Sequence, residues 1–328
     1  MSEKDAMERN LTLEAVRVTE AASLAASRLT GRGDEKAADQ AAVDAMRRAL
    51  NALAIDGTIV IGEGERDEAP MLYIGEKVGT GKGSKIDIAL DPLEGTTLTA
   101  KAGANALSVM AMSEAGGLLN APDVYMDKIA IGHGYGEIVD IDETPATNLK
   151  SLAKAKKRAI SDLNVCILDR PRHSELIARV REAGARIVLI SDGDVSSVMA
   201  TSRPDSGIDI YIGSGGAPEG VLAAAALRCI GGFMQGKLIF RNDDERARAR
   251  HHGITDFNRK YALTDLAKGE VLFSATGVTD GTMLKGVRFH PGGAVTHSMV
   301  MRSKTGTVRV IETYHDFERN HDMASFAK

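Results

Sequence analysis

The chain of 328 residues contains no tryptophan, only 4% of its residues are aromatic, and cysteine occurs twice. With so few aromatic side chains, packing must rest on Val, Ile, Leu, Met and Ala, and a hydrophobic share of 43% is enough for real cores. Cys166 lies in an apolar strand-like run and Cys229 in an Ala-rich helical stretch. Two such residues provide neither a disulfide framework nor a zinc site, so we expect both to be small buried side chains.

Basic tracts and long apolar runs are also missing. The net charge of −4 gives no general attraction to nucleic acid or to an anionic membrane, so an anionic ligand would need a local site. The N-terminus mixes Glu3, Asp5 and Glu8 with polar residues, and it lacks the apolar region of a signal peptide. No apolar run is long enough to cross a bilayer. We therefore expect a cytoplasmic protein with no nucleic-acid and no membrane partner.

The length is large for one hydrophobic core and suits two packed lobes. The first expected lobe, residues 1–146, starts with two helices, and Asp34 is the candidate cap of the second. Short β-like runs between residues 106 and 142, separated by Gly-rich turns, indicate an antiparallel sheet. The expected helices are 10–29 and 35–53, and the first expected strands are 58–61 and 85–90.

The second expected lobe, residues 147–328, alternates between strand and helix. This alternation indicates a parallel α/β layer, with ligands outside the carboxyl ends of the strands. The segment from about residue 270 could return to pack on the first lobe. The predicted fold is thus mixed α/β, with one antiparallel-sheet lobe and one parallel α/β lobe. The expected elements are strands at 165–168, 186–190 and 208–212, helices at 174–183, 194–200 and 218–230, a charged helical stretch at 241–260, and a hairpin formed by 294–301 and 307–313.

An acidic turn, Asp-Pro-Leu-Glu-Gly-Thr at residues 91–96, follows the apolar run 85–90. Pro92 fixes its own φ, and Gly95 permits a backbone conformation that most residues cannot adopt. Asp91 and Glu94 can then converge across the bend, and two hard oxygen ligands suit Mg²⁺ or Mn²⁺. Asp-Pro and Glu-Gly are also ordinary turn pairs, so a metal site needs support from other residues.

A glycine-rich segment at residues 213–220 leads into the last of the expected α/β helices. A dinucleotide fingerprint would need glycine where Pro218 stands, and a P-loop would need lysine where Val221 stands. What remains is a turn whose backbone can approach an anion at a helix N-terminus, with Glu219 facing back to the loop. Alternatively, Glu219 only complements the helix dipole.

Taken together, these motifs resemble the lithium-sensitive, metal-dependent phosphatases that include inositol monophosphatase and the fructose-bisphosphatases. Two departures are informative: Glu94 stands where the common pattern has Asp, and Pro218-Glu219 stands where it has Trp-Asp. Both departures match the bacterial class II fructose-1,6-bisphosphatases. The resemblance extends from Leu11 to about Thr313, and it implies a layered sugar-phosphatase fold. The matching segments are 56–65, 67–79, 91–96, 119–123, 170–173, 192–194, 216–219 and 275–281.

The resemblance implies hydrolysis of the 1-phosphate of fructose 1,6-bisphosphate, a step of gluconeogenesis, with Mg²⁺ or Mn²⁺ as cofactor. The backbone carbonyl of Leu93 is a further candidate ligand. In-line attack needs positioning more than covalent chemistry, so Thr96 is expected to orient water and not to act as nucleophile. The implied metal ligands are Asp39, Glu63, Asp91, Glu94 and Glu219, and the implied catalytic residues are Thr96, Asp39 and Glu63.

A bisphosphate needs a second anion site away from the metals. Arg170 and Arg172 are the expected holders of the distal phosphate, because guanidinium groups match phosphate oxygens. Two simpler roles stay open: Asp194 capping its helix, and one arginine pairing only with Asp169. His173 and His297 are unassigned. The full set of implied substrate-binding residues is Glu94, Gly95, Thr96, Tyr125, Arg170, Pro171, Arg172, Asp192, Gly193, Asp194 and Gly216.

Other functions remain possible at this point. The same chemistry could act on sedoheptulose 1,7-bisphosphate, or on an inositol or nucleotide phosphate. A non-catalytic sugar-phosphate-binding regulator is the alternative of a different class, and the intact Thr96 with all five acidic positions argues against it. Family analogy implies a homotetramer or a homodimer.

Overall fold

The computed structural model describes residues 11–64 and 71–327. The chain divides into two compact units: unit 1 comprises Met1–Leu118 with Gly269–Lys328, and unit 2 comprises Leu119–Lys268. The segment from residue 269 thus belongs to the same unit as the first 118 residues. The domain boundary expected from the sequence, between residues 146 and 147, stays a prediction.

Unit 1 contains an eight-stranded mixed sheet in the order β12-β13-β11-β4-β3-β1-β2, with β14 paired to β13. Among the described strand pairs of this sheet, β1 and β3 are parallel and the others are antiparallel. The described helices are α2 (Leu11–Ser27), α3 (Glu35–Asn51), α4 (Thr96–Ala100) and α11 (His321–Phe326). The strands are β1 (Asp56–Ile61), β2 (Lys77–Val78), β3 (Lys85–Glu94), β4 (Leu107–Glu114), β11 (Val271–Gly277), β12 (Arg288–His290), β13 (Gly293–Arg302) and β14 (Thr307–Asp316).

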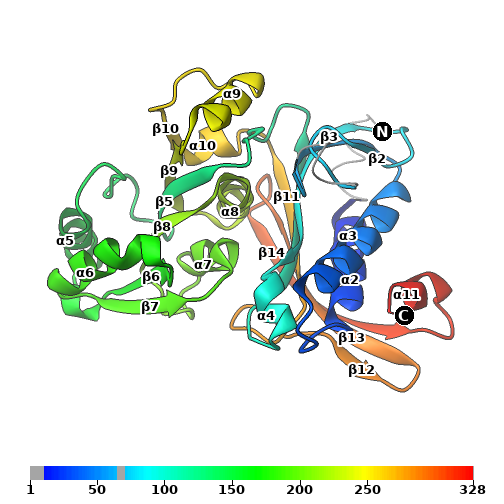
Figure 1. Ribbon diagram of the computed structural model, residues 1–328. Coiled ribbons are helices and arrows are strands. Elements are labelled where there is room, and N and C mark those ends of the chain that lie inside the picture. Colours follow the sequence, from blue (N-terminus) through cyan, green and yellow to red (C-terminus); the bar gives the residue numbers. More distant parts are fainter. Residues whose placement is uncertain (1–10, 65–70, 328) are drawn as a thin grey trace. The chain divides into compact units, whose positions relative to one another are not determined.

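Helices α2 and α3 lie side by side along this sheet (Figure 1), and both contribute to its main hydrophobic core. Asp34 caps α3 as predicted, because its Oδ1 accepts a hydrogen bond from the Ala37 N–H at 2.9 Å. On α2, the buried Thr19 hydroxyl lies 3.0 Å from Ser274 Oγ and 2.8 Å from Thr276 Oγ1 of β11. Polar and apolar contacts together therefore fix α2 on the sheet.

Unit 2 contains a six-stranded mixed sheet in the order β10-β9-β5-β8-β6-β7. Strand β6 runs parallel to both of its neighbours, β7 and β8, whereas the other pairs are antiparallel. The strands are β5 (Tyr125–Ile131), β6 (Asn164–Leu168), β7 (Arg186–Ile190), β8 (Ile210–Gly216), β9 (Phe233–Ile239) and β10 (Lys260–Ala262). The helices are α5 (Pro145–Lys156), η1 (Ile160–Asp162), η2 (Pro171–His173), α6 (Ser174–Glu182), α7 (Asp194–Ala200), α8 (Ala217–Ile230), α9 (Asp243–His251) and α10 (Leu263–Leu266).

The mixed α/β class is confirmed, but two details differ from the expectation. The runs between residues 106 and 142 do not form one sheet: β4 pairs with β3 and β11, whereas β5 pairs with β8 and β9. Both strands are almost wholly buried, so their local patterns do not say which sheet they join. The charged stretch 241–260 is helical only over α9 and reaches strand β10 at Lys260.

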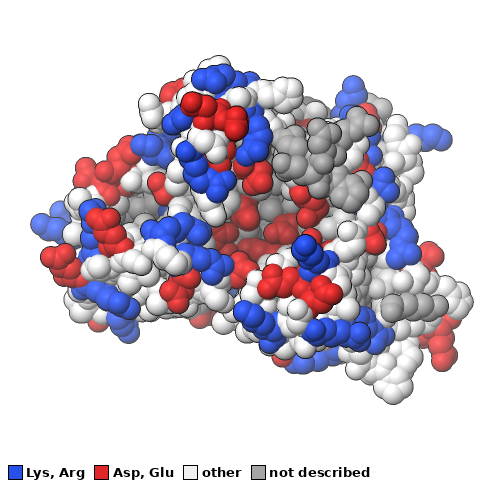
Figure 2. Space-filling model, viewed as in Figure 1, with Lys and Arg blue, Asp and Glu red and all other residues white. Residues whose placement is uncertain are grey.

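Several general properties follow from the described residues. Cys166 and Cys229 are both free and buried, as predicted. None of the described helices has the length and apolar character needed to cross a membrane. On the face drawn in Figure 2, both basic residues (blue) and acidic residues (red) are exposed among the described residues.

Candidate active site

Two acidic residues of unit 1, Glu63 and Asp91, lie near the ends of two neighbouring parallel strands. Strands β1 and β3 are parallel, and Ile61 is the register partner of Ala89 at the end of their pairing. Glu63 and Asp91 each lie two residues beyond that pair. Because parallel strands end at the same edge of a sheet, the two carboxylates belong to one region.

A β-bulge determines the direction of the next carboxylate. Asp91 pairs with Val109 and Glu94 pairs with Leu107, so three steps along β3 match two steps along β4. Val109 and Leu107 are two apart and thus face the same side of the sheet, and their partners must face that side too. Asp91 and Glu94 therefore share one face, which alternation without a bulge would forbid. The two residues lie at a bulge inside β3 and not in a turn after it, and their convergence on one point stays a prediction.

Local backbone contacts hold this segment. The Leu93 N–H donates to Asp91 Oδ1 at 3.0 Å, and Pro92 stands at the bulge, where a missing N–H is tolerated. Gly95 has φ +94°, and a Cβ there would come within 2.9 Å of Leu98 Cδ1. Glycine is therefore needed at the point where the strand turns into α4, whose first residue is Thr96.

Asp39 lies in the early turns of α3, next to α4. The Gly31 and Gly33 N–H groups, in the turn before α3, donate to the carbonyls of Thr99 and Ala100 at 2.9 Å each. These bonds join the approach to α3 to the C-terminal end of α4. Burial raises the pKa of the Asp39 carboxyl, because desolvation disfavours its charged form.

In unit 2, polar side chains collect where β6, β7 and β8 end. Arg172 follows β6, and its Nε and Nη2 donate to the Ser214 carbonyl of β8 at 3.2 and 2.8 Å. The same guanidinium lies 4.9 Å from the ring centroid of Tyr125, and the Arg241 guanidinium lies 5.1 Å from it. The structure thus brings together Arg172, Tyr125 and the end of β8, as expected for an anion site.

The Asp192-Gly193-Asp194 turn follows β7 at the same edge. Arg170 Nη2 lies 3.9 Å from Asp192 Oδ1. Arg170 also contacts Asp169, but through the backbone carbonyl of Asp169 and not through its carboxylate. The alternative of an ion pair between an arginine and the Asp169 carboxylate is therefore not found. Gly193, with φ +84°, is the N-cap of α7, and Asp194 is the first helical residue. The other alternative, Asp194 as a helix cap, is therefore wrong.

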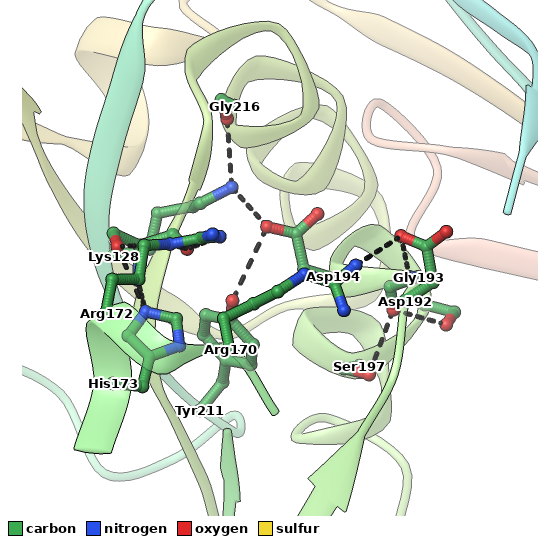
Figure 3. Close-up of polar contacts among 12 residues, drawn as sticks. Lys128, Arg170, Arg172, His173, Asp192, Gly193, Asp194, Ser197, Tyr211 and Gly216 are labelled. Carbon is green, nitrogen blue, oxygen red and sulfur yellow. Dashed lines mark hydrogen bonds and ion pairs between the residues drawn. The ribbon is translucent and has the colours of Figure 1, made fainter. Parts of the chain in front are cut away.

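The Asp194 carboxylate is engaged by residues that the sequence interpretation missed. Lys128 Nζ donates to Asp194 Oδ2 and, at 2.9 Å, to the Gly216 carbonyl (Figure 3). The Tyr211 hydroxyl lies 3.4 Å from the same Oδ2. A single lysine inside an apolar strand was the available signal, since a buried charge requires a partner.

His173 is also part of this edge, in a structural role. Its Nδ1 donates to the Leu168 carbonyl at 2.8 Å, and its Nε2 accepts from the Ser214 N–H at 2.9 Å. Burial lowers the pKa of His173, because desolvation disfavours the imidazolium. The ring is thus a neutral bridge between the loop after β6 and β8.

Glu219, in the first turn of α8, is a buried carboxyl. Its Oε2 is inaccessible and has no hydrogen-bond partner among the described residues. Burial raises the pKa of Glu219, the charge of Asp194 raises it further, and Lys128 opposes the shift. A Cβ on Gly216 would lie 1.6 Å from Glu219 Oε2, so glycine leaves room for the carboxylate over the turn. Such an oxygen fits a cation better than it fits a simple helix-dipole role.

The sequence-predicted ligands are all carboxylates, a ligand type that divalent metal ions accept. Asp39, Glu63, Asp91 and Glu94 belong to unit 1 and Glu219 to unit 2. Within residues 11–64 and 71–327, no three acidic, histidine or cysteine groups are already converged on one point. Mg²⁺ and Mn²⁺ are commonly held by one or two carboxylates, with water and phosphate oxygens completing the shell. The part of the acidic motif at residues 65–70 lies outside the described residues.

Comparison with known proteins gives the family. A family model described as "Bacterial fructose-1,6-bisphosphatase, glpX-encoded" matches residues 9–315, through both units. The chain belongs to this family. It is 46% identical over 327 residues to "Fructose-1,6-bisphosphatase 1 class 2" of Escherichia coli (strain K12), covering 95% of this chain and 97% of the relative. It is also 46% identical over 334 residues to the "D-fructose 1,6-bisphosphatase class 2/sedoheptulose 1,7-bisphosphatase" of Synechococcus sp. (strain JA-2-3B'a(2-13)), covering 94% of this chain and 96% of the relative.

The family resemblance expected from the sequence is confirmed. Fructose-1,6-bisphosphatases are phosphoric monoester hydrolases, and this family is metal-dependent. Within unit 1, Asp91 and Glu94 share one face of β3, and within unit 2, Arg170 and Arg172 follow β6.

Proposed function

We propose that this chain hydrolyses the 1-phosphate of fructose 1,6-bisphosphate in the presence of Mg²⁺ or Mn²⁺, giving fructose 6-phosphate and phosphate. The observation that carries the proposal is the family match over residues 9–315, which includes every assigned site residue. The bulge that turns Asp91 and Glu94 to one face supports the proposal independently, because two carboxylates on one face are available to bind the same metal ion.

The proposed metal ligands are the five carboxylates Asp39, Glu63, Asp91, Glu94 and Glu219, with the Leu93 carbonyl as a further candidate. When bound, the metal supplies positive charge to the phosphate oxygens and lowers the pKa of water at the site. Thr96 and Asp39, aided by Glu63, orient the attacking water in line with the departing sugar oxygen. Thr96 is the first residue of α4, directly after Gly95, so the helix start sets the position of its hydroxyl group.

The sugar and the distal phosphate are assigned to unit 2. Arg172 has five N–H donors, and its Nε and one Nη2 hydrogen serve Ser214, which leaves three for phosphate oxygens. Arg170, beside Pro171, supplies the second positive charge. Tyr125, Asp192, Gly193, Asp194 and Gly216 complete the proposed sugar contacts, and Glu94, Gly95 and Thr96 contact the reacting phosphate.

A second activity, on sedoheptulose 1,7-bisphosphate, is favoured by the name of the Synechococcus relative, which includes both substrates. A panel of fructose 1,6-bisphosphate, sedoheptulose 1,7-bisphosphate, an inositol monophosphate and a nucleoside monophosphate separates the candidates. We expect phosphate release from fructose 1,6-bisphosphate, whether or not sedoheptulose 1,7-bisphosphate is also hydrolysed. Preference for an inositol or nucleotide phosphate would contradict the proposal.

The family also leads us to propose a cytoplasmic setting and a homotetramer or homodimer. Light scattering coupled to size-exclusion chromatography tests the assembly, and a monomer at working concentration would contradict it.

A further inference from the structure

Lys128 is a buried charged residue of unit 2 for which the proposed function has no role. It lies in the middle of β5 with 1% of its surface exposed, and the register places it opposite Gly213 of β8. A lysine is rarely enclosed to this degree, because its ammonium must find acceptors to replace water. The location of those acceptors is therefore informative.

The two acceptors of Lys128 Nζ belong to different segments of the proposed sugar site. One is Asp194 Oδ2, after β7, and the other is the Gly216 carbonyl, at the end of β8, 2.9 Å from Nζ. The ammonium thus connects Asp194 directly to the turn that carries Gly216 and leads to Glu219. Figure 3 shows Nζ between these two groups.

The surroundings of Lys128 allow little other placement. A Cβ on Gly215 would lie 2.9 Å from Lys128 Nζ and 2.2 Å from Asp194 Oδ2, so the β8 backbone closes directly over the ion pair. A Cβ on Gly220, in α8, would lie 3.5 Å from Lys128 Cδ. The side chain is therefore enclosed between β8 and the first turn of α8.

The contacts also set the rotation of the Asp194 carboxylate. Lys128 Nζ and the Tyr211 hydroxyl both meet Oδ2, with Tyr211 at 3.4 Å. When both donors converge on one oxygen, the other oxygen, Oδ1, is held in a fixed direction and can accept from a ligand hydroxyl. Without these donors the carboxylate could rotate, and the Lys128 charge would no longer offset the repulsion between Asp194 and Glu219.

We propose that Lys128 is a positioning residue for the sugar half of the substrate, fixing the Asp194 carboxylate and the Gly216 turn in their binding geometry. The inference rests on the proposed function, because the ligand it concerns is a fructose phosphate. Lys128 acts through Asp194 and Gly216 and does not itself contact the reacting phosphate. Its effect is therefore on sugar recognition and not on the distal phosphate held by Arg172.

The test compares Lys128→Met with a matched control, Lys156→Met, in the full-length chain. Lys156 Nζ also pairs with a buried aspartate, Asp209, at 2.5 Å. Asp209 directly precedes β8, and Gly216 ends it. At about 3.3 Å per strand residue, the control pair lies about 23 Å from Gly216. The readouts are the dissociation constants of fructose 6-phosphate and of inorganic phosphate, measured by titration calorimetry in Mg²⁺ buffer, with circular dichroism to verify folding.

We expect Lys128→Met to weaken fructose 6-phosphate binding by at least about tenfold, and inorganic phosphate binding by less than about twofold. Lys156→Met should change neither constant by more than about twofold. Unchanged fructose 6-phosphate affinity in Lys128→Met overturns the inference, and so does an equal loss for both ligands, which would indicate simple charge attraction. If the wild-type chain binds no fructose 6-phosphate, the proposed function fails and the inference fails with it.

Removal of Lys128 alone leaves Asp194 buried without its cation, and that variant could fail to fold. A second comparison therefore uses Asp194→Asn and the double variant Lys128→Met/Asp194→Asn. The double variant removes both charges of the buried pair, and Asp194→Asn keeps the Lys128 ammonium with the Gly216 carbonyl as its acceptor. The double variant should bind fructose 6-phosphate at least about threefold more weakly than Asp194→Asn, because the hold on the Gly216 carbonyl is also lost. Equal affinities of these two variants would overturn the inference.

Discussion

Replacing Arg172 by Ala should raise KM for fructose 1,6-bisphosphate strongly while leaving hydrolysis of fructose 1-phosphate almost unaffected. The Arg172 guanidinium is held by two N–H donations to the Ser214 carbonyl and by the Tyr125 ring, so it is oriented before any ligand arrives. Three of its N–H groups remain for the distal phosphate. A charge-assisted contact of this kind contributes about 2 to 3 kcal/mol, which corresponds to an increase of roughly 30- to 160-fold in KM.

The assay measures kcat and KM for both substrates in wild type, Arg172→Ala and Arg319→Ala. Arg319 is a suitable control, because its exposed side chain belongs to unit 1 and pairs with Asp316, three residues away, at 3.3 Å. Fructose 1-phosphate should already be a poor substrate for the wild type, since it lacks the remote binding energy that aligns the reacting phosphate. An equal Arg172→Ala penalty for both substrates would refute the assignment and make Arg170 the next candidate.

Three further predictions concern unit 1. Asp91→Asn or Glu94→Gln should lower turnover by roughly 10²- to 10³-fold or more, because each removes a metal ligand. The thermal melt of either variant should be unchanged, because neighbouring carboxylates repel one another without metal. Near-normal activity at saturating metal would reject the ligand assignment. Thr96→Ala should lower kcat by roughly 10²-fold with little change in KM, and a raised KM at constant kcat would instead make Thr96 a substrate-binding residue. Burial lowers the pKa of His315 from 6.5 to about 4, so the folded state becomes less stable as pH falls below 6.5. In urea unfolding, the free energy of unfolding of the wild type should fall by about 2 kcal/mol more than that of His315→Gln between pH 7 and pH 5. The same pH dependence in both proteins would contradict this.

Much of the fold follows from local signals. Asp34 caps α3 where the sequence predicts a cap, and the apolar runs after residue 147 become β6, β7 and β8 in parallel, because their patterns require no distant information. The grouping of β4 and β5 into one sheet was wrong, since two strands buried on both faces look alike until their partners are known.

The site shows the same division between local and non-local information. The motif at Asp91 and Glu94 was recognised from its residues, but the bulge that turns both side chains to one face depends on pairing with β4. Lys128 was missed because its role depends on two segments that approach it only in the folded chain, those of Asp194 and Gly216. Sequence patterns thus identified the groups that carry charge, and the fold determined which of them are neighbours.

The most direct test of the proposed function is the product formed by the metal-stripped wild-type chain after metal is restored. The protein is treated with chelator, dialysed, and incubated with fructose 1,6-bisphosphate alone or with added Mg²⁺ or Mn²⁺, while phosphate and the sugar monophosphate are both quantified. We predict no phosphate release without metal, and release of one phosphate per sugar with metal, leaving fructose 6-phosphate. Release that survives chelation, or fructose 1-phosphate as the product, would contradict the proposed function.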